Sequence, residues 1–356
     1  MGGLADATLL AVLAIGCLRG AGALLRARWP RRAPATAILV WQALGLAGGL
    51  AAVGALLAIG VGGNGVAQSG VVGGLTALVR QHAAGQLTGA GEPVLLTLIR
   101  LGSLLAGIAL FAVLCWVLVM AFVTAVHARR RQRELLALLA HGDPKAPGAL
   151  VVDYPAAAAY CLPGIKSQIV VSVGTLDLLA PAELAAVLAH ERAHLRARHD
   201  LVLIPFTSLR RAFPRSRVIC QAYRTVALLV EMMADDRALR VRGLLARELA
   251  TALLRFGTAS SGNTPAPAGA LAVAAVAGDA GDFAGSALPS GSGDAVRAGA
   301  ASGPGGPADP STEGDLTARV NRLLTPPRPL SRPVQAAIVL SAALLVAAPI
   351  LLLIAP

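Results

Sequence analysis

The residues whose types and spacing suggest chemistry lie in the segment His190-Glu191-Arg192-Ala193-His194. Positions 190 and 194 are one helical turn apart, so in a helix both imidazoles project from one face and can bind one cation together. Glu191 points about 100° further round the helix, which places a carboxylate base beside the same cation. The segment therefore predicts a metal centre that hydrolyses a bond with the help of a general base.

A catalytic metal centre of this kind needs a third protein ligand, and the best candidate downstream is Glu231. Glu231 and Asp235 share one face of a helix predicted from about 218 to 240, directly after an apolar run. We interpret Glu231 as the third ligand and Asp235 as the partner of a ligand histidine through its other ring nitrogen. A surface acidic pair is the alternative. Zinc (Zn2+) is the expected cofactor, although manganese, cobalt or iron suits the same ligands.

The elements that must position these residues are a strand and a helix. The β-branched run at 169–173 ends at Gly174 and predicts a strand. Pro181 then opens a helix that carries the motif, with Glu183 favourable in its first turn. Ala180 stands where a Ser, Thr or Asp would cap that helix.

The composition places this site in a membrane protein. Hydrophobic residues make up 56% of the 356 residues and charged residues only 14%, and the mean hydropathy is +0.68. The net charge of +12 comes with only 3% aromatic residues, and the arginines cluster beside apolar runs, so we expect membrane lipid and no direct nucleic-acid binding. Four apolar segments predict transmembrane helices, at about 4–18, 37–61, 101–126 and 334–354.

The arginines predict the orientation of these helices. Several lie between the first two apolar segments and after the third, so both places are expected to be cytoplasmic. The chain is then a multi-pass cell-membrane protein with a cytoplasmic active site and with its N- and C-termini outside. A secretory signal is the alternative for the first segment, which lacks the usual basic start. In the outside connection, residues 71–82 suit either a short amphipathic helix or a solvated linker.

The expected fold class is an α-helical membrane protein with four transmembrane helices and a cytoplasmic α/β (α+β) zincin-like peptidase domain. The Gly, Ala, Ser and Pro content of 257–314 predicts a disordered insertion, because so few large side chains cannot offset the entropy of ordering. The predicted regions are 1–126 (membrane), 127–256 (peptidase), 257–314 (insertion), 315–332 (return segment) and 334–354 (last helix).

The motifs resemble a known family. The runs Gly174 to Leu179 and Leu188 to His194, then Arg198-His199-Asp200, and later Glu231-Met232-Met233-Ala234-Asp235, are similar to the gluzincin membrane peptidases of the BlaR/MecR type. HtpX and the CAAX prenyl proteases are more distant relatives. The sequence has no penicillin-binding sensor domain after its last apolar segment, and no His-Pro-Pro element before Arg319.

The resemblance implies roles for individual residues. His190, His194 and Glu231 would be zinc ligands, Glu191 the general base and Asp235 the partner of a ligand histidine. His199 and Asp200 would have a structural hydrogen-bond role, and Arg319 would either steady an oxyanion or be a membrane-proximal charge. Residues 169–173 would form an edge strand that pairs with an extended peptide. All of these residues are present at the matching positions.

The resemblance also implies the partner. It favours a regulatory endopeptidase that cleaves a cytoplasmic protein, either a winged-helix repressor of the BlaI type or the chain itself. A constitutive quality-control protease of membrane proteins is the second hypothesis. The third is a non-proteolytic receptor or scaffold that zinc stabilises, which the presence of Glu191 disfavours, because a structural zinc site has four protein ligands and needs no base.

Overall fold

The computed structural model describes residues 2–61, 73, 75–76, 80, 93–164, 167–241, 243–260 and 310–354. The amphipathic stretch predicted at 71–82 therefore lies largely outside the described residues. The chain folds into two compact units. The helical unit contains Met1–Ala128, Asp200–Met233 and Pro327–Pro356, and the sheet unit contains Arg129–His199 and Ala234–Pro326.

Among the described residues, four helices are long and apolar enough to cross a membrane, as the sequence predicted. They are α1 (Gly2–Arg26), α2 (Pro34–Val61), α4 (Val94–Leu139) and α11 (Arg332–Ile354). Helix α1 is longer than the predicted 4–18, because the residues from Arg19 to Arg26 are mostly Ala, Leu and Arg, which are good helix formers. The basic connection to α2 contains a short 3-10 helix, η1 (Trp29–Arg32).

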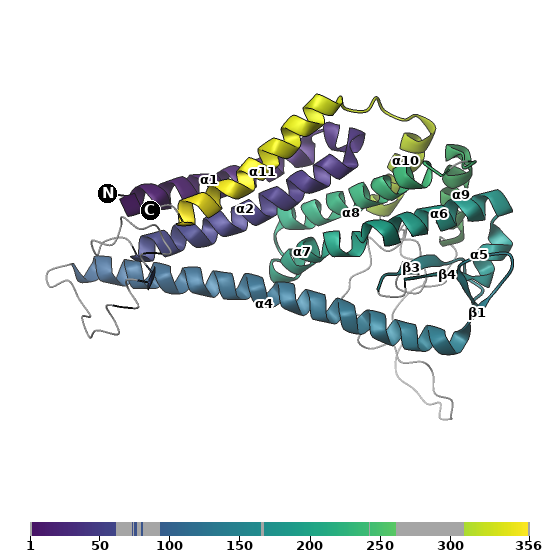
Figure 1. The fold of residues 1–356 in the computed structure, drawn as a ribbon, viewed down its shortest axis with the longest axis horizontal. Helices are drawn as coiled ribbons and strands as arrows, with labels where there is room; N and C mark the ends of the chain where they lie inside the picture. Colours follow the sequence, from purple (N-terminus) through teal and green to yellow (C-terminus); the bar gives the residue numbers. More distant parts are fainter. Residues whose placement is uncertain are drawn as a thin grey trace, which may run out of the picture. The chain divides into compact units, whose positions relative to one another are not determined.

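Small residues bring the helices of this unit together. Figure 1 shows α1, α2 and α11 running side by side. A side chain at Gly60 of α2 would meet the backbone nitrogen of Leu104 in α4 at 2.9 Å, so only glycine allows this approach. The opposite faces expose large apolar side chains such as Leu9, Trp116 and Leu351, as expected for helices in contact with lipid.

The helical unit also contains α7 (His199–Ala212) and most of α8 (Arg217–Ala238). The side chain of Gln42 in α2 donates to the carbonyl of Val202 in α7 (2.8 Å), and Arg211 donates to the hydroxyl of Thr124 (3.1 Å). Helix α8 continues without a break into the sheet unit after Met233. One rigid helix therefore carries both Glu231 and Asp235.

In the described part of the sheet unit, four short strands form a sheet in the order β1-β2-β4-β3. They are β1 (Ala140–Gly142), β2 (Leu150–Val152), β3 (Ala159–Leu162) and β4 (Gln168–Ser172). Strand β4 pairs in parallel with β2 and antiparallel with β3. The prediction that 169–173 forms an edge strand is therefore wrong: β4 is an inner strand, and β3 is at the edge. Four consecutive buried residues in β4 are typical of an inner strand, which is covered on both faces.

A close backbone approach links the sheet to the next helices. Val173 begins helix α5 (Val173–Leu178) instead of ending the strand. A side chain at Gly174 would lie 2.0 Å from the carbonyl oxygen of Pro155, so this position requires glycine. The Ser172 hydroxyl accepts from the Thr175 amide (3.2 Å) and caps α5. The chain thus turns tightly from β4 towards α6 (Pro181–Ala197).

The helix that carries the motif begins without a side-chain acceptor at its N-cap, as Ala180 predicts. Instead, the carboxylate of Glu183 accepts from the amide of Ala180 (2.9 Å) and satisfies one of the unpaired donors at the helix start. Apolar residues of α6 such as Val187 and Leu188 pack on Val171 and Ile169 of β4. The sheet therefore fixes the helix from one side.

The prediction of a disordered insertion at 257–314 is wrong at both ends. Helix α9 (Ala246–Ser260) runs past Gly257, and helix α10 (Pro310–Leu324) begins before Gly314. Phe256 is buried in the core and anchors the end of α9, and α9 and α10 pack together through Leu253 and Leu323. The two ends of the predicted insertion contain few large side chains, but each end continues a helix whose neighbouring residues are packed in the core. Residues 261–309 lie outside the described part of the chain.

Candidate metal centre

The two histidines of the motif face one another from successive turns of α6. The Nε2 atoms of His190 and His194 are 3.0 Å apart, and His190 is almost fully buried. Two nitrogens bound to one tetrahedral zinc ion at about 2.0–2.1 Å would be roughly 3.3–3.4 Å apart. The imidazoles are therefore already arranged for one shared cation.

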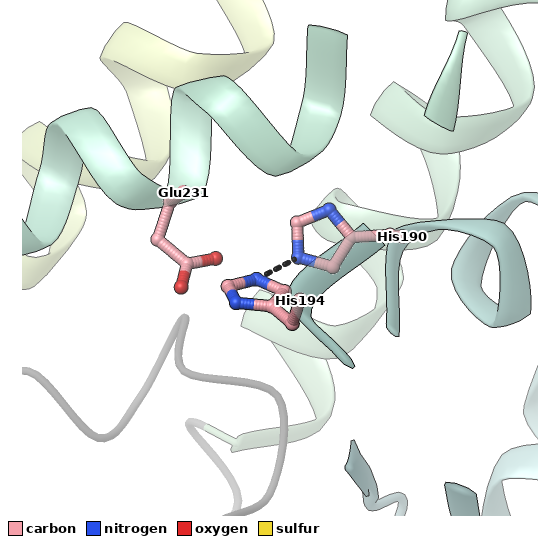
Figure 2. Close-up of side chains that lie close together, drawn as sticks. All are labelled: His190, His194 and Glu231. Carbon is pink, nitrogen blue, oxygen red and sulfur yellow. Dashed lines mark hydrogen bonds between the residues drawn. The ribbon is translucent and has the colours of Figure 1, made fainter. Parts of the chain in front are cut away.

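Glu231 completes the ligand set from α8. His190, His194 and Glu231 each offer one ligand atom, and these atoms all lie within 4.8 Å of one another (Figure 2). This is the set of metal-binding side chains found among the described residues. Glu231 is 5% exposed. Two imidazoles and one carboxylate are a protein ligand set of catalytic zinc sites, in which water takes the fourth position.

A buried pair of charges holds His190 in place. Its Nδ1 lies 2.9 Å from Oδ1 of Asp235. Arg319 of α10 donates to both oxygens of the same carboxylate, from Nη2 (2.8 Å) and from Nε (2.9 Å). All three side chains are at most 2% exposed. A fixed hydrogen bond at the second ring nitrogen orients a ligand histidine and raises its basicity.

The environment of Asp235 keeps its carboxylate ionised. Burial raises the pKa of Asp235, but the Arg319 guanidinium and the hydrogen bond to His190 outweigh it and lower the pKa to about 2. Arg319 is thus engaged with Asp235 and positions it. This geometry favours a structural role for Arg319 over the alternative of steadying an oxyanion.

His199 supports the second ligand histidine. Arg198 adopts a left-handed conformation (φ 48°) that ends α6 and starts α7 at the next residue. The turn brings Nδ1 of His199 to 3.0 Å from Nδ1 of His194. Arg237 of α8 lies 3.2 Å from the other nitrogen of His199. These contacts are compatible with the structural hydrogen-bond role that the resemblance implied for His199, which stays a prediction; Asp200 follows it in the first turn of α7.

Glu191 is buried (4% exposed) on α6, next to His190 in the sequence. The structure thus brings the three predicted ligands and the predicted partner Asp235 together, and the predicted base Glu191 lies on the same helix as the two histidines. Sequence reasoning missed Arg237 as a partner of His199 and the bidentate pair of Arg322 with Asp236. The sequence carries a signal for the pair of Arg322 with Asp236. Arg319 and Arg322 are one turn apart on α10, so two arginines on one face are available to two consecutive acids, Asp235 and Asp236.

Comparison with known proteins finds a family for part of the chain. Residues 125–260 match the model of peptidase family M48. The matched region includes the motif on α6 and Glu231 and Asp235 on α8, and it supports an M48-type metallopeptidase domain in a chain with four apolar helices. No curated protein and no solved structure matches the chain. The narrower BlaR/MecR assignment stays a prediction.

Proposed function

We propose that this protein is a membrane-anchored zinc endopeptidase. The observation that carries the proposal is the convergence of His190, His194 and Glu231 within 4.8 Å, with Glu191 beside His190 on the same helix. The match of residues 125–260 to peptidase family M48 supports it independently.

The residues divide the chemistry between them. A zinc ion held by the two histidines and Glu231 would polarise the scissile carbonyl and make water more acidic. The carboxylate of Glu191 accepts the proton from the attacking water and delivers it to the leaving amine nitrogen. Asp235 keeps His190 oriented through Nδ1, and Arg319 keeps Asp235 ionised.

The edge strand β3 supports a peptide as the substrate. Its outer side is the edge of the four-stranded sheet, and α6 packs against it within the same unit. An extended peptide adds to such an edge through main-chain hydrogen bonds, with its scissile bond then presented to α6. We infer that β3, in place of the inner strand β4, receives the substrate.

The positions of the arginines support a cytoplasmic substrate. Arg28, Arg31 and Arg32 lie between α1 and α2, and the basic run 129–131 follows the apolar part of α4. Under the positive-inside rule both regions are cytoplasmic, and both termini are outside. We propose a regulatory role, with a winged-helix repressor of the BlaI type or the chain itself as substrate.

Proteolysis by the full-length protein reconstituted in lipid nanodiscs tests the proposal. Wild type and Glu191→Ala are compared at matched zinc content, with the chain itself and a co-encoded winged-helix repressor as substrates. We expect Glu191→Ala to slow cleavage by at least about 100-fold, whereas Glu134→Ala, which removes an exposed carboxylate of α4, leaves the rate unchanged. Equal rates for wild type and Glu191→Ala would reject the enzyme and leave a zinc-stabilised receptor.

A further inference from the structure

A second concave site lies on another face of α6, within the sheet unit. It has a volume of about 640 Å³ and lies between α6 and the end of α8 with the turn that follows. We call it the arginine groove, because Arg192, Arg196, Arg237 and Arg240 line it together with small residues such as Ala185 and Ala189. Ala189 and His190 are consecutive, so the groove lies about 100° round the helix from the ligand histidines.

The charge of this groove is not balanced by the described protein. Its lining contains four arginines and no acidic side chain. Among the described residues, none of the four arginines forms an ion pair. Arg192 donates to the carbonyl of Pro147 (3.0 Å), and Arg237 contacts His199. Four like charges around one cavity repel one another, so a bound anion would stabilise the arrangement.

We propose that the arginine groove binds a phosphate-bearing anion. A guanidinium presents a planar fork of donors that matches the oxygens of phosphate. A phosphate group has more acceptor oxygens and more charge than one carboxylate, so one phosphate can accept hydrogen bonds from more than one guanidinium. The volume suits a small molecule or a headgroup better than a long peptide, because ligand cavities are typically about 300–1,000 Å³.

Two sources supply this chemistry, a phospholipid headgroup and a soluble phosphate compound. The rim of the groove favours the lipid. Val241 lines the groove and is 44% exposed, and the nearby Leu245 is 61% exposed, so apolar surface lies beside the arginines. A lipid offers a phosphate and an apolar chain together, and anionic lipids attract basic surfaces.

The test uses the full-length protein in phosphatidylcholine nanodiscs. Pyrophosphate binding is measured by calorimetry, and retention of added phosphatidic acid is measured by native mass spectrometry. The groove variant combines Arg196→Gln and Arg240→Gln, which are exposed and outside the metal centre. The control combines Arg217→Gln and Arg247→Gln, which remove the same charge from exposed residues that do not line the groove.

We expect the groove variant to weaken binding at least about tenfold, and the control to change it less than about twofold. Loss of pyrophosphate binding identifies a soluble phosphate site, and loss of phosphatidic acid retention alone identifies a headgroup site. Both results support the proposal. Equal binding by the groove variant and wild type, equal losses in both double variants, or binding of a polyglutamate peptide but of neither phosphate compound would overturn it.

Discussion

The helical unit exposes large apolar side chains, whereas the sheet unit contains a buried pair of opposite charges. In the helical unit, apolar side chains point outwards: Trp116 is 66% exposed and Val12 is 67% exposed. In the sheet unit, charged side chains are buried: Asp235 and Arg319 are at most 2% exposed. Outward apolar groups suit a lipid solvent, whereas buried charges are stable only when they are paired and hydrogen-bonded. The contrast distinguishes side chains that suit lipid from buried charges that need partners.

The largest effect is expected for the buried charges. Asp235→Ala leaves Arg319 and His190 buried without their shared partner and should destabilise the sheet unit by about 3–5 kcal/mol. The neighbouring Asp236, which also forms a bidentate pair with an arginine of α10, is 36% exposed at its side chain, so Asp236→Ala should cost at most about 1 kcal/mol. Thermal unfolding of the metal-free protein measures both. Equal losses would show that burial does not decide the difference.

Among the exposed apolar side chains of the helical unit, a new charge should oppose membrane insertion. Leu118 is 43% exposed on α4, and Leu118→Arg should make membrane insertion of this helix less favourable by about 2.5–3.5 kcal/mol. Leu245, which is 61% exposed in the sheet unit, should accept the same change within about 0.5 kcal/mol. A translocation assay on the α4 segment and unfolding of the Leu245→Arg protein measure these effects. Full insertion of the Leu118→Arg segment would place that face of α4 away from lipid.

Acid should remove the contribution of Asp235. Its pKa is lowered in the folded protein from 3.8 to about 2, so the stabilisation is present above pH 4 and is lost as the pH falls from about 4 towards 2. The full contribution is roughly 2 kcal/mol. Unfolding of the metal-free protein against pH checks this, with Asp235→Asn as the comparison. An identical loss of stability below pH 4 in this variant would assign the effect to other carboxyl groups.

A smaller effect is expected at His199, which contacts His194 and is not one of the three proposed ligands. His199→Ala should lower zinc affinity about 10- to 100-fold by removing the partner of a ligand histidine. His141→Ala, at an exposed position on β1, serves as the control. Competition with a chelator of known affinity measures both. Unchanged affinity in His199→Ala would leave this residue with a role in packing alone.

The site was more predictable than the fold around it. His190 and His194 are four residues apart, as are Glu231 and Asp235. Helix geometry alone therefore predicts that the two members of each pair lie on one face of a helix. The position of β4 inside the sheet depends on the pairing of distant strands, which spacing does not contain, although its continuous buried run was a readable signal. The contact of Arg237 with His199 depends on the left-handed turn at Arg198, a conformation unusual for arginine.

The most direct test of the central claim is the metal content of the full-length protein and three variants, measured by mass spectrometry after purification in detergent. We predict one zinc ion per chain in the wild type and in Glu191→Gln, because Glu191 is a base and not a ligand. We predict that His194→Ala and Glu231→Ala lose the ion while their metal-free forms remain folded. Retention of zinc in Glu231→Ala, or its loss in Glu191→Gln, would contradict the account.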